Sequence, residues 1–235
     1  MEGVGGWAQY DSPVSRCKLG AARSTTCIPC RTCRTIANRE YSVTPPDGPS
    51  ILSVSLPDWV GAAVPWDARF STDEARMDLA IALSRENVDR GTGGPFGACV
   101  FEQESGRLVA AGVNSVQRHN NSVLHAEMVA LMMAQHRLQH FTLHDEGLPL
   151  HDLVTSCDPC AMCFGAVLWS GVRRVVSGAT RDDAANLGFD EGPVFDESYR
   201  YLEARGIKFH RKVRRQAAVE VLERYRRAGG AIYNG

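Results

Sequence analysis

Residues 153–163, LVTSCDPCAMC, are the stretch of sequence that decides the fold. The apolar residues 153–155 predict a short buried strand. Asp158 followed by Pro159 predicts a helix start, because aspartate is a good N-cap and proline is favoured at the first helical position. A buried strand that runs into a helix is typical of α/β proteins.

The two thiols at Cys160 and Cys163 are three residues apart, so on a helix they share one face. In a first helical turn, free backbone N–H groups and the helix dipole favour thiolates. His125 can supply a third ligand from another predicted helix start. Three protein ligands leave the fourth position of a tetrahedral zinc ion open to water, which is typical of a catalytic site. We therefore predict one zinc ion per chain.

Glu127 is the candidate general base beside this zinc site. Two thiolates neutralise the ion, so the metal activates its water less than a site made only of histidines would. Residues 125 and 127 of an ideal helix point about 200° apart. Both side chains can face one site only if the helix begins at or within about one residue of His125.

Strands and helices alternate outward from this unit. Residues 71–74 predict a capping box for a helix that ends near Gly91, and the loop 91–97 is rich in turn residues. The other predicted elements are strands at 98–101, 108–114, 173–178 and 207–210, and helices at 126–139, 158–170, 182–186, 196–204 and 214–227. The pattern predicts an α/β fold, with three α-β-α layers and a central mixed sheet.

Residues 1–50 differ in composition from residues 51–235. The first part is rich in glycine, serine, threonine, proline and arginine, so we predict a poorly structured extension or linker. The second part is predicted to form one globular domain. Four of the eight cysteines lie in the first part, as either a second metal site or an unstructured tail: Cys17, Cys27, Cys30 and Cys33. We expect Cys99 and Cys157 to be buried core thiols.

The composition of the 235 residues excludes few classes of protein. The net charge of -1 gives no electrostatic argument for a nucleic-acid or membrane partner. No apolar run approaches the length of about 20 residues that a membrane helix needs. No secretory signal is visible at the N-terminus, so we expect a cytoplasmic protein.

His-x-Glu followed by Pro-Cys-x-x-Cys resembles the signature of zinc-dependent nucleobase deaminases. Over about residues 55–235 the chain resembles the cytidine/deoxycytidylate deaminase superfamily, and within it bacterial guanine deaminases and their relatives that accept aminotriazines such as ammeline. The resemblance rests further on the loop 93–98, on Asn114, on the motif 188–191, and on the tail 232–234, which is similar to a segment that closes over the pocket. It implies a cytidine deaminase-like fold, a zinc deaminase domain at 51–235 and a homodimer.

The same resemblance implies roles for individual residues. Glu127 would pass a proton from the zinc-bound water to the ring, and Glu191 would protonate the departing ammonia. In the motif that the chain resembles, the best-known guanine deaminases have an aspartate at the place of residue 191. The glutamate of this chain departs from that pattern. The implied substrate-binding residues are Phe96, Asn114, Ala126 and Trp169, with Phe96 or Trp169 stacking on the ring and Asn114 reading its edge.

The implied reaction is the conversion of guanine to xanthine and ammonia, with a small nucleobase and no nucleic acid as partner. Other readings stay open at this point. They are deamination of an aminotriazine, of guanosine or of cytidine, deamination of adenosine in tRNA, and a non-catalytic zinc-stabilised interaction module. Glu127 argues against the last reading, because such a module would not need it.

Overall fold

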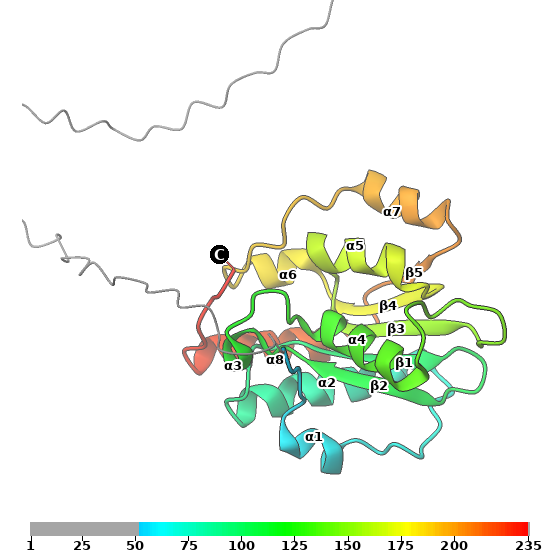
Figure 1. Ribbon diagram of the computed structural model, residues 1–235. Helices are drawn as coiled ribbons and strands as arrows, with labels where there is room; N and C mark the ends of the chain where they lie inside the picture. The colour runs from blue at the N-terminus through cyan, green and yellow to red at the C-terminus, as the bar shows by residue number, and fades with distance from the viewer. Residues whose placement is uncertain (1–51, 235) are drawn as a thin grey trace, which may run out of the picture. The chain divides into compact units, whose positions relative to one another are not determined.

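The computed structural model describes residues 52–234, which form a sheet of five strands with helices on both faces (Figure 1). The strands are β1 (Gly97–Glu102), β2 (Leu108–Val113), β3 (His151–Cys157), β4 (Arg174–Ala179) and β5 (Lys208–His210). The helices are α1 (Asp58–Ala63), α2 (Asp73–Asp89), α3 (Val116–His119), α4 (Ala126–Leu138), α5 (Ala161–Ser170), α6 (Arg181–Ala185), α7 (Asp196–Glu203) and α8 (Arg215–Arg227).

The sheet is mixed, as the sequence predicts, with the strand order β2-β1-β3-β4-β5. β1 pairs antiparallel with both β2 and β3. β3, β4 and β5 run parallel, and the connections between them carry α5, α6 and α7. The zinc motif therefore follows the central strand β3 directly.

Alternate residues of β1 divide the hydrophobic core between the two faces of the sheet. Cys99 and Phe101 lie in one core with residues of α2 and α8. Ala98 and Val100 lie in the other with residues of α4 and α5. All four side chains are fully buried, which accounts for the continuous apolar run in this strand. The predicted three-layer α-β-α arrangement is confirmed.

A glycine in β2 lets the start of α4 lie close to the sheet. A Cβ atom built on Gly112 would be 2.3 Å from the carbonyl oxygen of Ala126. Only glycine permits that approach, so Gly112 determines how close the first turn of α4, which carries Glu127, lies to the sheet.

The structure differs most from the predicted boundaries at the start of α5, and it adds two elements. The N-cap of α5 is Cys160, not Asp158, and the helix begins at Ala161. The short helices α1 and α3 have no counterpart in the sequence prediction. None of the helices in residues 52–234 is long and apolar enough to cross a membrane. The N-terminal cysteines lie outside the described residues, so both readings of them stay predictions.

Candidate metal centre and active site

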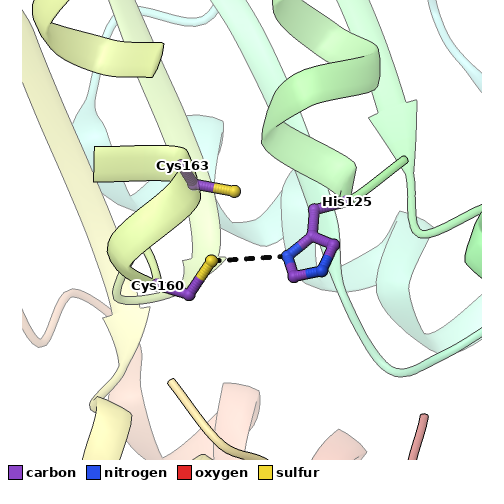
Figure 2. Close-up of side chains that lie close together, drawn as sticks. All are labelled: His125, Cys160 and Cys163. Carbon is purple, nitrogen blue, oxygen red and sulfur yellow. Dashed lines mark hydrogen bonds between the residues drawn. The ribbon is translucent and has the colours of Figure 1, made fainter. Parts of the chain in front are cut away.

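Two helix starts bring the three predicted zinc ligands together (Figure 2). His125 is the N-cap of α4, and its ψ of 159° is extended, not helical. Cys160 is the N-cap of α5, with a ψ of 174°, and Cys163 lies in the first turn of the same helix. The prediction that α4 begins within about one residue of His125 is confirmed.

The ligand atoms have the spacing that a tetrahedral zinc ion requires. His125 Nδ1 lies 3.5 Å from Cys160 Sγ, and the ligand atoms of all three residues lie within 4.8 Å of one another. Two ligands of zinc, with bonds of about 2.3 Å to sulfur and 2.0–2.1 Å to nitrogen, lie about 3.6 Å apart. One imidazole and two thiols are also a donor set that zinc prefers. The three residues therefore fit the predicted ion.

The hydrogen bond between the two thiols shifts their pKa values in opposite directions. The hydrogen bond with Cys163 is the main cause that lowers the pKa of Cys160 to about 4, with His125 adding to it. The same hydrogen bond and burial raise the pKa of Cys163 well above its ordinary value. Cys160 is thus a ready thiolate, and a bound divalent cation favours the deprotonated form of both.

Glu127 lies in the first turn of α4 with only 6% of its surface exposed. Burial, followed by the negative charge of Cys160, raises its pKa to about 7. A buried carboxylate with a raised pKa beside a metal site is a candidate for proton transfer.

Glu191 approaches the same site from the loop between α6 and α7. Its carbonyl oxygen accepts a hydrogen bond of 2.9 Å from the backbone N–H of Ala161, which ties the loop to the start of α5. Burial, and then the negative charges of Cys160 and Glu127, raise the pKa of Glu191 to about 8. Two carboxylates thus converge on one zinc site.

A narrow inner cavity of about 10 Å³ lies between these groups, which is room for about one water molecule. It is lined by Phe96, His125, Glu127, Cys157, Asp158, Cys160, Glu191, Tyr233 and Asn234. An outer vestibule of about 360 Å³ shares four of these residues: His125, Cys160, Glu191 and Asn234. Asn234 therefore stands between the vestibule and the inner cavity.

The C-terminal tail is fastened over this cavity by its own hydrogen bonds. Asn234 Nδ2 donates to the carbonyl oxygen of Asp190, and the Asp190 N–H donates to the carbonyl oxygen of Asn234, both at 3.0 Å. The Tyr233 ring packs edge-on against Phe189, with ring centroids 5.2 Å apart. The tail thus forms one wall of the pocket of its own chain.

The predicted substrate-binding residues fall into three groups. Phe96 lines the cavity, whereas Ala126 and Asn114 are fully buried beside it. The Asn114 N–H donates to the carbonyl oxygen of Phe96 at 3.0 Å. Trp169 is 78% exposed on α5 and does not line the cavity of this chain, so its role in stacking on the base stays a prediction.

Asp158 and Cys157 also line the cavity, and the sequence reasoning missed both. Asp158, predicted as a helix N-cap, instead accepts hydrogen bonds from Ser177 Oγ at 2.5 Å and from Arg211 Nε at 3.1 Å. Cys157 is a buried thiol at the end of β3, as predicted, and its Sγ lies 3.5 Å from the carbonyl oxygen of Thr180. The only feature of the sequence that could have identified them as cavity-lining residues is their position next to the Pro-Cys-x-x-Cys motif.

Comparisons with known proteins agree with this geometry. Residues 70–179 match the family model described as the cytidine and deoxycytidylate deaminase zinc-binding region. The guanine deaminase of Bacillus subtilis is 36% identical over 137 residues, which are 58% of this chain and 83% of that protein. A solved structure of guanine deaminase from Nitrosomonas europaea is 44% identical with a TM-score of 0.72, covering 75% of this chain and 97% of that one.

A tRNA-specific adenosine deaminase from Buchnera aphidicola is more distant, at 28% identity over 56% of this chain and 79% of that protein. The predicted fold, zinc cofactor and superfamily are confirmed together. The chain belongs to the family of zinc-dependent cytidine and deoxycytidylate deaminases, with guanine deaminases among its relatives.

Proposed function

We propose that this protein removes the amino group of a free purine base by hydrolysis, converting guanine to xanthine and ammonia. The observation that carries the proposal is the convergence of Glu127 and Glu191 on the zinc ligands at one narrow cavity. The similarity to two guanine deaminases, at 36% and 44% identity, supports guanine as the base.

The chain's own carboxylates divide the proton transfers. A zinc ion on the three ligands supplies a Lewis acid and an activated water. Glu127 accepts the proton of the attacking water and returns it to the ring nitrogen next to the carbon that bears the amino group. Glu191, whose pKa is raised to about 8, donates its proton to the amino group as it leaves as ammonia, and it is reprotonated by the second proton of the former water when the new carbonyl forms. Both side chains line the same cavity, so each can reach one small ring.

Phe96 and Asn114 support recognition of a flat ring with polar edges. The Phe96 ring is held by an edge-to-face contact with Phe189, at a centroid distance of 5.1 Å. Asn114 Nδ2 is buried, and no acceptor among the described residues lies within hydrogen-bonding distance of it. A ring nitrogen or the exocyclic carbonyl oxygen of the base is a suitable acceptor for this donor.

The closed tail supports a free base as substrate in preference to a nucleoside or tRNA. Tyr233 and Asn234 line the inner cavity, and Asn234 is tied to Asp190 at its mouth. A ribose or a polynucleotide attached to the ring would have to pass through these contacts. The tail must open to admit any ligand, since the cavity holds only about 10 Å³, so the preference for a free base arises when the tail closes again over a ring that carries no ribose.

An ammonia-release assay on a panel of six compounds tests the proposal: guanine, ammeline, guanosine, adenine, cytosine and cytidine. We expect guanine to have the highest kcat/KM. A preference for ammeline would move the assignment to aminotriazines, and a preference for a nucleoside would contradict the role of the tail. If zinc-loaded, folded protein released ammonia from none of them, the proposal would fail.

Three further predictions complete the proposed function: a role in purine catabolism, a homodimer and a cytoplasmic location. Degradation of guanine supports the first. The dimer is supported by an apolar groove of about 380 Å³ between α5 and α7 and by the exposed Trp169 and Tyr201. The location is supported by the free thiols of Cys99 and Cys157, since such thiols are typical of a reducing compartment.

A further inference from the structure

Asn87 is a fully buried polar residue near the end of α2 that does not line the cavity. Its side-chain amide nevertheless contacts two segments that form the pocket. Asn87 Nδ2 donates to the carbonyl oxygen of Gly94 at 2.9 Å and to that of Asn114 at 3.0 Å. Both amide hydrogens are thereby used, one on each segment.

The acceptor side of the Asn87 amide is equally occupied. Its Oδ1 accepts a hydrogen bond of 2.7 Å from Thr92 Oγ1, and that hydroxyl in turn accepts one of 3.1 Å from Trp59 Nε1. The Thr92 N–H donates to the Asn87 carbonyl oxygen at 3.0 Å. A chain of hydrogen bonds thus runs from α1 through α2 to the loop and to Asn114.

The loop and the end of β2 approach as closely as backbone atoms can at this point. A Cβ atom on Gly93 would be 2.1 Å from the Asn114 carbonyl oxygen and 2.7 Å from Asn87 Nδ2. Glycine is therefore required at position 93. The Asn87 amide sets the separation of the two segments across this contact.

We infer that Asn87 is a positioning residue, which holds the Phe96 loop and Asn114 at the separation that lets both contact one base. It touches neither the base nor the zinc ligands. The inference rests on the proposed function in taking Asn114 as the residue that contacts the base. An amide is needed because a carboxylate cannot donate to two carbonyl oxygens and an apolar side chain would leave both unpaired.

A double-mutant cycle separates positioning from simple stabilisation of the fold. Asn87→Ala and Asn114→Ala are made singly and together, and kcat, KM and Tm are measured with the best base of the panel. We expect Asn87→Ala to lower kcat/KM about tenfold or more, mainly through KM, when Asn114 is present, and by less than about twofold when it is absent. The loss in Tm should be the same in both backgrounds.

Equal losses of kcat/KM in the two backgrounds would overturn the inference, because Asn87 would then act on the fold alone. Ser84→Ala is the matched control, since Ser84 is a buried polar residue on α2 with no hydrogen-bond partner among the described residues. We expect it to leave KM unchanged. If Asn87→Ala fails to fold, Asn87→Ser takes its place in the same cycle.

Hydrogen exchange tests the inference even if the proposed function fails. If the wild-type protein deaminates no base, the amide exchange rates of Phe96 and Asn114 are compared in the wild type, Asn87→Ala and Ser84→Ala. The Phe96 N–H bonds to Gly94 O at 2.9 Å, and the Asn114 N–H bonds to Phe96 O at 3.0 Å. Faster exchange of both amides in Asn87→Ala alone is expected, and unchanged exchange would overturn the inference.

Discussion

At the scale of single residues, Glu127 combines features that rarely occur together. It is a buried acid, it forms no salt bridge with any of residues 52–234, and it lies one residue after the start of a helix whose N-cap is a predicted metal ligand. Burial of an unpaired carboxylate destabilises the fold, so its presence is explained by chemistry and not by stability.

Replacing Glu127 by Gln should lower kcat about 10²- to 10⁴-fold, because the amide cannot accept the proton of the attacking water. Zinc content, measured by mass spectrometry, should remain one ion per chain, since Glu127 is not a ligand. Glu104→Gln, in an exposed turn, is the control and should retain full activity. If the activity of Glu127→Gln were within tenfold of the wild-type activity, the proposed role of Glu127 in proton transfer would be contradicted.

At the scale of elements, the site depends on where helices begin, and the sequence predicts this unevenly. The start of α4 was predictable, because His125 and Glu127 can face one site only from a helix entry. The start of α5 was not, because Asp158 has the features of an N-cap and yet pairs with Arg211, 53 residues further along the chain. Helix propensity and capping preferences depend on neighbouring residues only, so they cannot predict an interaction with a residue so far along the chain.

The stacking prediction shows a second limit of the same kind. Phe96 and Trp169 are both flat aromatic residues near the motifs, but only Phe96 lines the cavity. The face of α5 that carries Trp169 points to the surface, and helical spacing alone did not distinguish the two. The buried strands, the mixed sheet and the metal ligands follow from apolar periodicity and motif spacing, whereas the strand order and the residues that line the pocket depend on contacts between distant segments.

The contact between Gly94 and the tail allows a direct test of closure. A Cβ atom at position 94 would lie 2.2 Å from Tyr233 Oη, so Gly94→Ala should displace the tail. We expect KM to rise about tenfold with little change in Tm, because the tail lies beyond α8 and outside the sheet. Steady-state kinetics and thermal unfolding measure the two effects.

Gly61→Ala is the matched control for this substitution, because a Cβ atom there meets nothing within 4 Å. It should leave both KM and Tm close to their wild-type values. If Gly94→Ala also left KM unchanged, the tail would not close the pocket during turnover.

At the scale of the whole molecule, an ion pair connects α6, which follows the parallel strand β4, to the C-terminal helix α8. Asp183 accepts hydrogen bonds from the Thr180 N–H at 2.8 Å and from Arg215 Nε at 2.8 Å, which joins α6 to α8. Burial raises the pKa of Asp183, but the hydrogen bonds with Arg215 and Thr180 lower it by more. The pKa of Asp183 in the folded chain is therefore below its ordinary value of 3.8.

Asp183 should therefore stabilise the fold in a way that depends on pH. Because its pKa is lower in the folded than in the unfolded chain, its contribution is fully present above 3.8 and is lost as the pH falls through the folded value. Asp183→Ala should lower the free energy of unfolding by about 1–2 kcal/mol at pH 7, through loss of the capping box.

Urea unfolding at pH 7 and at about pH 3 checks this, with the difference between variant and wild type shrinking at the lower pH. Asp182→Ala is the control, because Asp182 is exposed in the same helical turn. A difference that stayed constant with pH would show that the charge of Asp183 contributes nothing.

The two N-cap ligands also affect the charge balance of the site. A zinc ion and two thiolates sum to zero, which by itself would leave the centre indifferent to a negative charge that develops on the substrate. Each helix start adds about half a positive charge from its unpaired N–H groups, and α4 and α5 both begin at a ligand. The backbone thus restores part of the positive potential that the thiolates cancel.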